Sequence, residues 1–157
     1  MVARALVCVP VDDEQVARIA RGEALVGPLQ VFTVTPELLD TFGLQPVDDE
    51  PAEYAALLLA ALWGLLRHGR RLVLTAQVPK NAMDAGEESA NGGRSLAQLP
   101  ANAVEAWFAD EPGTPIAEVA QQVAGLDLDE AWEHQAVQEL HKDHDLLWHS
   151  VVELGKG

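Results

Sequence analysis

Short apolar segments separated by turn residues predict β-strands at several places along the chain. Residues 4–11 are rich in valine and leucine, residues 29–34 alternate between apolar and polar side chains, and residues 72–78 are almost continuously apolar. A continuous apolar run is typical of a strand that is buried on both faces, so 72–78 is the expected centre of the sheet. Residues 103–109 supply a fourth strand.

The last segment, residues 145–154, fits two kinds of element. Apart from one serine, every second position from Leu146 to Leu154 is apolar, which favours a strand. Asp145 is also a suitable cap, and Gly155 a suitable stop, for a short helix. We predict a strand and keep the helix as the alternative.

Capping residues mark the starts of several helices. Aspartate and threonine side chains can accept hydrogen bonds from the free N–H groups of a first turn, and proline fits the first helical position. Two Thr-Pro pairs and two aspartates stand where such helices would begin. The predicted helices cover residues 13–22, 36–43, 51–68, 115–124 and 129–141.

The clearest of these helices runs from about Pro51 to His68. Acidic residues precede it and cations with a glycine close it, as the helix dipole favours. Its apolar residues occur almost all round the helix, so it should be buried on most sides. We expect Leu58, Leu62 and Leu65 to lie in the core.

Residues 80–95 lack any apolar periodicity and contain the run Asn91-Gly92-Gly93. Such a composition is typical of a long flexible loop. We therefore expect this stretch to be the most mobile part of the protein.

Strands that alternate with helices predict an α/β (α+β mixed) fold. With 157 residues, of which 48% are hydrophobic, residues 1–157 are the size of a single globular domain. We predict about five strands in one mixed sheet with helices packed on it. Because both outer thirds have the order strand, acidic turn, helix, strand, a ferredoxin-like duplication is an open alternative.

The single cysteine excludes an internal disulfide, so a cytoplasmic location is expected. Cys8 stands in an apolar run and is predicted to be a small buried side chain. The segment before Pro10 is too short, and is followed too soon by acidic residues, for a signal peptide. The most apolar run, residues 54–66, falls short of the roughly 20 residues that a membrane span needs.

The chain is strongly acidic. Its 25 acidic and 10 basic residues give a formal charge of −15, which repels nucleic-acid backbones and anionic membranes. Residues 105–139 hold nine acidic residues and no lysine or arginine. This run is either a solvated helical face or a docking surface for a basic protein partner.

Four of the five histidines lie in the last 24 residues. His141, His144 and Asp145, together with Trp148, form the candidate pocket. Imidazole and carboxylate groups are ligands of zinc, manganese and iron, yet their spacing matches no established metal motif. We predict no tightly bound metal and no cofactor.

Several short motifs spread over nearly the whole chain carry a resemblance to a known family. The most specific is His144-Asp145-Leu146-Leu147-Trp148. The others are Val9-Pro10, Phe32-Thr33-Val34-Thr35-Pro36, Glu53-Tyr54-Ala55-Ala56-Leu57 and Leu72-Val73-Leu74-Thr75-Ala76-Gln77-Val78-Pro79. Together they resemble an uncharacterised, domain-of-unknown-function family of small acidic actinobacterial proteins. The resemblance implies one domain and carries no activity.

The sequence holds no dinucleotide-binding, phosphate-loop or nucleophile-elbow motif. We therefore favour a protein-interaction or regulatory protein without catalytic activity, whose homo-oligomeric state is open. The alternative is a small metal-binding protein or enzyme built on the C-terminal His/Asp cluster. A mimic of nucleic-acid charge ranks last.

Overall fold

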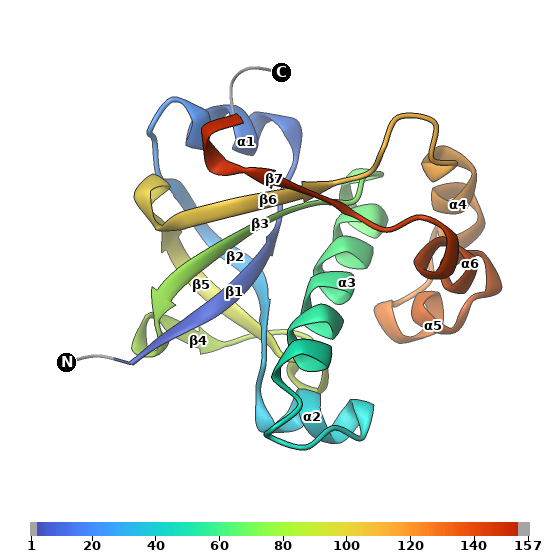
Figure 1. Cartoon of the computed structure of the whole chain (residues 1–157), viewed down its shortest axis with the longest axis horizontal. Coiled ribbons are helices and arrows are strands. Elements are labelled where there is room, and N and C mark those ends of the chain that lie inside the picture. Colours follow the sequence, from blue (N-terminus) through green and yellow to red (C-terminus); the bar gives the residue numbers. More distant parts are fainter. Residues whose placement is uncertain (1–2, 154–157) are drawn as a thin grey trace.

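The computed structural model describes residues 3–153, and the strands in this range form one sheet of seven (Figure 1). The strands are β1 (Arg4–Pro10), β2 (Leu25–Thr33), β3 (Leu72–Pro79), β4 (Met83–Ala85), β5 (Gly93–Leu99), β6 (Val104–Ala109) and β7 (Leu147–Ser150). Their order is β4-β5-β2-β1-β3-β6-β7, and every neighbouring pair is antiparallel. The prediction of about five strands in a mixed sheet is corrected to seven antiparallel ones.

Of the two additional strands, β4 lies wholly and β5 partly in the segment that was predicted to be a loop. Residues 80–95 contain β4, the start of β5, and short 3-10 turns at Lys80–Ala82 and Ser89–Asn91. The buried Asn91 side chain donates to the carboxylate of Asp129, and the carbonyl of Gly92 accepts from the N–H of Thr33. Polar and backbone contacts anchor this segment, and hydrophobic periodicity does not detect them. Its mobility stays a prediction.

The described residues also form six α-helices. They are α1 (Asp13–Ala20), α2 (Pro36–Phe42), α3 (Asp49–His68), α4 (Ile116–Val123), α5 (Leu128–Glu133) and α6 (Gln135–Asp143). Figure 1 shows α3 beside the sheet, and α4, α5 and α6 gathered on the far side of α3. In the part of the chain that the structure describes, no helix has the length and apolar character needed to cross a membrane.

Two of the predicted helix starts are confirmed in detail. The Asp12 carboxylate accepts from the N–H of Gln15 at 2.9 Å at the start of α1, and the Thr35 hydroxyl accepts from the N–H of Leu38 at 3.1 Å at the start of α2. The second Thr-Pro pair acts differently, because the Thr114 hydroxyl donates to the carbonyl of Glu111 at 2.7 Å. Helix α4 accordingly begins without a side-chain cap.

The single helix predicted over residues 129–141 is two helices. Asp127, rather than Asp129, caps α5. The chain then breaks at His134, where the backbone is extended and Nδ1 accepts from the N–H of Ala136 at 3.0 Å. A spacing of seven residues would place His134 and His141 on one face of a continuous helix, but His134 caps α6 instead and does not share a face with His141.

Strand β2 begins earlier than predicted. The strand was predicted over residues 29–34, but Gly27-Pro28 also lies inside it, and the peptide bond of this pair is cis. The pairing with β5 shifts its register between Val26 and Leu29. The strand thus continues through an irregularity at the glycine and proline instead of starting after them.

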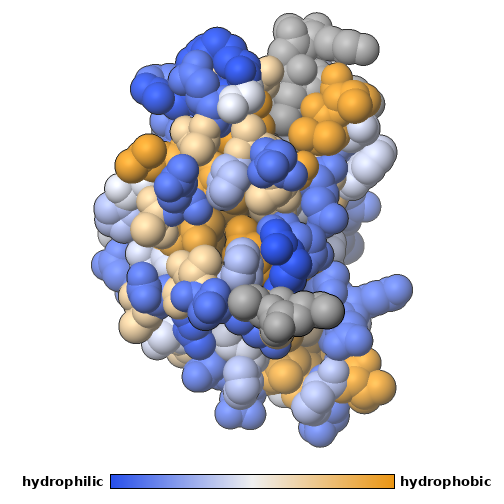
Figure 2. All heavy atoms as spheres, turned by 90° about the vertical axis from the view of Figure 1, so that its left-hand side faces the viewer, coloured by the Kyte–Doolittle hydropathy of each residue, from blue (hydrophilic) through white to orange (hydrophobic). Residues whose placement is uncertain are grey.

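The sheet has one hydrophobic cluster on each face. On the first face, α3 packs over β1, β2 and β3, α4 and α5 pack in turn against α3, and Leu62 and Leu65 are almost fully buried there. Leu58 is also buried, so the predicted core position of all three leucines is confirmed. The opposite face packs against α1 through Ile19. Figure 2 shows the side of the molecule away from α4–α6, where hydrophilic residues surround a central hollow with hydrophobic residues.

The arrangement gives no support to a duplication. Strands β1 and β2 are joined by one helix, α1, whereas β6 and β7 are joined by three, α4, α5 and α6. The side chains of α1 belong to one hydrophobic cluster and those of α4–α6 to the other. The helices of the two strand-helix-strand units therefore lie on opposite faces of the sheet and differ in number.

Candidate functional site

The four residues of the predicted pocket lie at the end of α6 and along the chain that follows. His141 is on the inner side of α6, with its ring centroid 4.8 Å from that of Trp132. Burial, together with a smaller effect of the positive charge of Arg71, lowers the pKa of His141 to about 4. The imidazole is therefore neutral at pH 7 and packs like an apolar ring.

His144 follows the last turn of α6, and its carbonyl accepts from Nη2 of Arg71 at 2.9 Å. Arg71 is itself buried and forms an ion pair with Asp110. The backbone of His144 is thus fastened to the sheet, while its side chain lines a cavity between α4 and α6.

Asp145 and Trp148 are exposed. Trp148 lies on β7, directly opposite Phe108 of β6. Burial raises the pKa of Tyr54, and the negative charge of Asp145 raises it further, so the carboxylate lies within electrostatic reach of that phenol. Of the four predicted residues, only His144 lines the cavity. The expectation that Trp148 and His144 share one pocket is therefore corrected.

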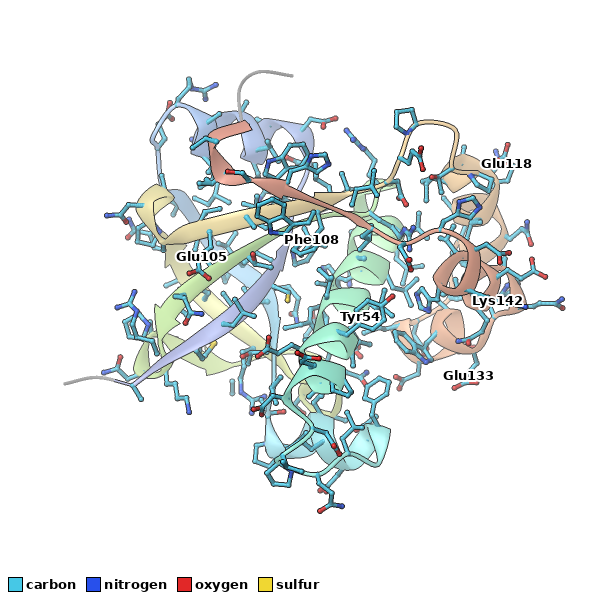
Figure 3. The ribbon with its side chains drawn as sticks, viewed as in Figure 1. Tyr54, Glu105, Phe108, Glu118, Glu133 and Lys142 are labelled. Carbon is cyan, nitrogen blue, oxygen red and sulfur yellow. The ribbon has the colours of Figure 1, made fainter. Side chains whose placement is uncertain are left out.

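The cavity has a volume of about 450 Å³ and lies between α4 and α6. Three carboxylates line it, from Glu118 on α4 and from Glu139 and Asp143 on α6. His134, His144, Gln122 and Gln135 supply the other polar groups of its lining, and none of its lining residues is a lysine or an arginine. The cavity is thus acidic, open at the surface and suited to a cation. Figure 3 shows Glu118, one of its carboxylates, on α4.

Some of these polar groups are already engaged. Nδ1 of His134 accepts from the N–H of Ala136, and one carboxylate oxygen of Glu139 accepts from Nε2 of Gln135 at 3.1 Å. The carboxylates of Glu118 and Asp143 accept no hydrogen bond from the described residues. Within residues 3–153, no three histidine, cysteine or acidic side chains converge closely enough to hold a metal ion.

The other tryptophans serve packing and internal contacts. The ring of Trp107 stacks on that of His149 at 4.0 Å, and its Nε1 donates to the carbonyl of Ser150 at 3.1 Å. Trp63 meets the edge of Phe32 and carries the guanidinium of Arg67 over its face at 4.2 Å. Contacts within the chain therefore hold the rings of Trp63 and Trp107 in place.

Cys8 is buried in the sheet, as its apolar neighbours predict. Burial raises the pKa of the Cys8 thiol to about 12, and the carboxylate of Glu53 acts in the same direction. The thiol is therefore protonated at neutral pH and unsuited to nucleophilic chemistry.

Glu118 and Glu139 were not predicted as individual site residues. The run of acidic residues between 105 and 139 contains both of them and was the available signal. That run could not show that these two carboxylates, on separate helices, would face the same cavity as Asp143.

The chain belongs to a family of unknown function (DUF6912), whose family model matches residues 6–156. Membership in a domain-of-unknown-function family, inferred from the short motifs, is thereby confirmed. Searches of curated proteins and of solved structures find no match to this chain.

Proposed function

We propose that this member of the DUF6912 family is a non-catalytic interaction protein that binds a basic segment of a protein partner. The site is the acidic cavity between α4 and α6. One observation carries the proposal: the carboxylates of Glu118, Glu139 and Asp143 line one open cavity that has no cationic side chain in its lining.

The dimensions and the charge of the cavity fit a lysine or arginine side chain. A volume of about 450 Å³ lies within the range of pockets that take small organic groups. A cation that enters it gains from three nearby carboxylates, and the overall charge of −15 steers a basic partner toward the protein.

The same charge disfavours the other classes of partner. Nucleic acids, anionic membranes and a second copy of this chain all carry negative charge.

The proposed location is the cytoplasm, which the lone, buried Cys8 thiol supports because the protein needs no oxidising compartment.

The test uses a fluorescently labelled, lysine-rich peptide and the full chain, with binding followed by fluorescence anisotropy. The cavity variant combines Glu118→Gln, Glu139→Gln and Asp143→Asn. The matched control makes the same change of charge at exposed acidic residues outside the cavity, namely Asp40→Asn, Asp49→Asn and Asp84→Asn. Exposed charge pairs are each worth about 0.2–1 kcal/mol, so the cavity variant should bind about tenfold more weakly than the wild type.

Binding to the control variant should weaken by no more than about twofold, because its changes affect only the long-range field. If both variants lost the same amount of affinity for the peptide, net charge alone would explain the loss. That result would contradict a binding site in the cavity. Failure of the wild-type chain to bind the lysine-rich peptide at low salt would contradict the proposed function itself.

A further inference from the structure

Three aromatic side chains lie on the side of the molecule where β6 and β7 pass α3. They are Tyr54, Phe108 and Trp148, which we call the aromatic patch. Trp148 is 62% exposed and Tyr54 is 47% exposed, whereas Phe108 is partly buried. Figure 3 shows Phe108 and Tyr54 on the side that faces the viewer, on β6 and α3.

The sheet register places two of these rings next to each other. Trp148 of β7 is the direct cross-strand partner of Phe108 of β6, so their side chains project from the same face. Strand β7 ends the sheet order in the described part of the chain, and α3 covers the sheet through its contacts with β1, β2 and β3. Phe108 and Trp148 thus lie on the part of this face that extends beyond α3, whereas Tyr54 belongs to α3 itself.

Carboxylates flank the aromatic patch. Asp145 is exposed and close enough to Tyr54 to raise the pKa of its phenol, after the larger effect of burial. Glu105, a further exposed carboxylate, lies about 10 Å from Phe108 along β6, since a strand rises about 3.3 Å per residue. The nearby cation, Arg71, is fully enclosed and already paired with Asp110. The exposed polar groups around the patch therefore carry negative charge.

We propose that the aromatic patch binds an arginine side chain of the basic partner, an inference that rests on the proposed function. A planar guanidinium stacks on aromatic faces and donates to carboxylates in the same plane, whereas a lysine ammonium is a compact and strongly hydrated charge. Exposed aromatic rings edged by carboxylates thus select arginine over lysine. A second copy of the chain would bring another charge of −15 to the same surface.

The protein contains an internal example of this contact. The guanidinium of Arg67 lies 4.2 Å from the ring centre of Trp63, on the surface of α3. Both residues belong to α3 and are one turn apart, so a cation of the same chain already covers this face of the Trp63 ring. Among the described residues, the ring of Trp148 has no such cation over it, and its exposed face is available to a partner's arginine.

The experiment compares two labelled peptides of the same length and charge, one with arginines and one with lysines. The wild-type chain should bind the arginine peptide about fivefold more tightly, as expected for one exposed cation–π contact. Trp148→Ala should remove this preference and leave the affinity for the lysine peptide unchanged. Val47→Ala, at another exposed apolar residue, is the matched control and should change neither affinity.

The outcomes separate the two proposals. If the lysine peptide binds to the cavity but the wild type shows no preference for arginine, or if Trp148→Ala keeps the preference, the aromatic patch is not an arginine site. If the arginine preference depends on Trp148 while the cavity variant binds normally, the patch is a site and the cavity is not. Dimers of the wild type in sedimentation that Trp148→Ala dissociates would show that a second copy covers the patch, and would overturn the inference.

Discussion

The guanidinium of Arg71 forms a two-pronged ion pair with the carboxylate of Asp110, in which Nε donates to Oδ2 at 3.0 Å and Nη2 donates to Oδ1. Nη2 also donates to the carbonyl of His144 at 2.9 Å. Arg71 precedes β3 and Asp110 follows β6, so the pair joins two neighbouring strands at the point where the chain leaves α6. With only 1% of its side chain exposed, Arg71 fastens the end of the helical segment to the sheet.

Loss of the carboxylate in Asp110→Ala should destabilise the protein strongly. The cation of Arg71 would stay buried without its ion-pair partner, and its Nη1 already has no hydrogen-bond partner among the described residues. Breaking one side of a buried pair typically lowers the free energy of unfolding by about 3–5 kcal/mol. Urea unfolding, followed by circular dichroism, measures this change.

The neighbouring residue supplies the control. Arg70 pairs with Asp13, and both of these side chains are at least half exposed. Arg70→Ala should therefore lower the free energy of unfolding by less than about 1 kcal/mol. A loss of that small size in Asp110→Ala as well would show that the Arg71 pair contributes no more than a surface pair.

The stability of the protein should depend on pH through His141. Its pKa is about 4 in the folded protein, mainly because it is buried, whereas an exposed histidine titrates near 6.5. The unfolded chain therefore takes up the proton first as the pH falls. The contribution of His141 to stability is complete above about pH 6.5 and is lost progressively toward pH 4.

Between pH 7 and pH 4, the wild type should lose roughly 1–3 kcal/mol more of its free energy of unfolding than the variant His141→Gln, which has no titrating ring. Carboxylates also titrate in this range, but they do so in both proteins. Urea unfolding at several pH values gives the difference. A nuclear magnetic resonance titration of His141 with its midpoint near 6.5 would contradict the buried, neutral imidazole.

Local signals predicted much of the fold because they act within a few residues of sequence. The caps at Asp12 and Thr35 and the apolar run of α3 each specify an element without help from the rest of the chain. The break at His134 was missed because histidine is an unusual cap, and the bond from the Ala136 N–H to its Nδ1 is visible only in three dimensions.

The candidate site was predicted less well, because it depends on where one helix ends. His141 and His144 are three residues apart and would share a face if α6 continued. The helix ends at Asp143, so His144 turns toward the cavity while His141 stays against Trp132. The cavity also needs Glu118 from another helix, a long-range relationship that the spacing of residues in the sequence does not reveal.

The segment between β4 and β5 passes close to β2, and Gly92 is the residue that permits this approach. Its φ is +80°, and a Cβ at this position would lie 2.2 Å from the carbonyl oxygen of Thr33 and 2.8 Å from Cδ1 of Leu38. Gly92→Ala therefore combines the strain of a left-handed conformation with a displacement of the β2 backbone. Together these effects should lower the free energy of unfolding by about 2–4 kcal/mol.

Gly113→Ala separates the two effects, because Gly113 has a φ of +96° and none of the atoms of the described chain would lie within 4 Å of its Cβ. This variant should show the conformational strain alone, at about 1 kcal/mol. Urea unfolding of both variants therefore measures how closely residues 80–95 pack against the sheet. Equal losses in the two variants would mean that the segment moves away from β2 at no cost, as a flexible loop does, and that the contact between Gly92 and Thr33 contributes nothing to stability.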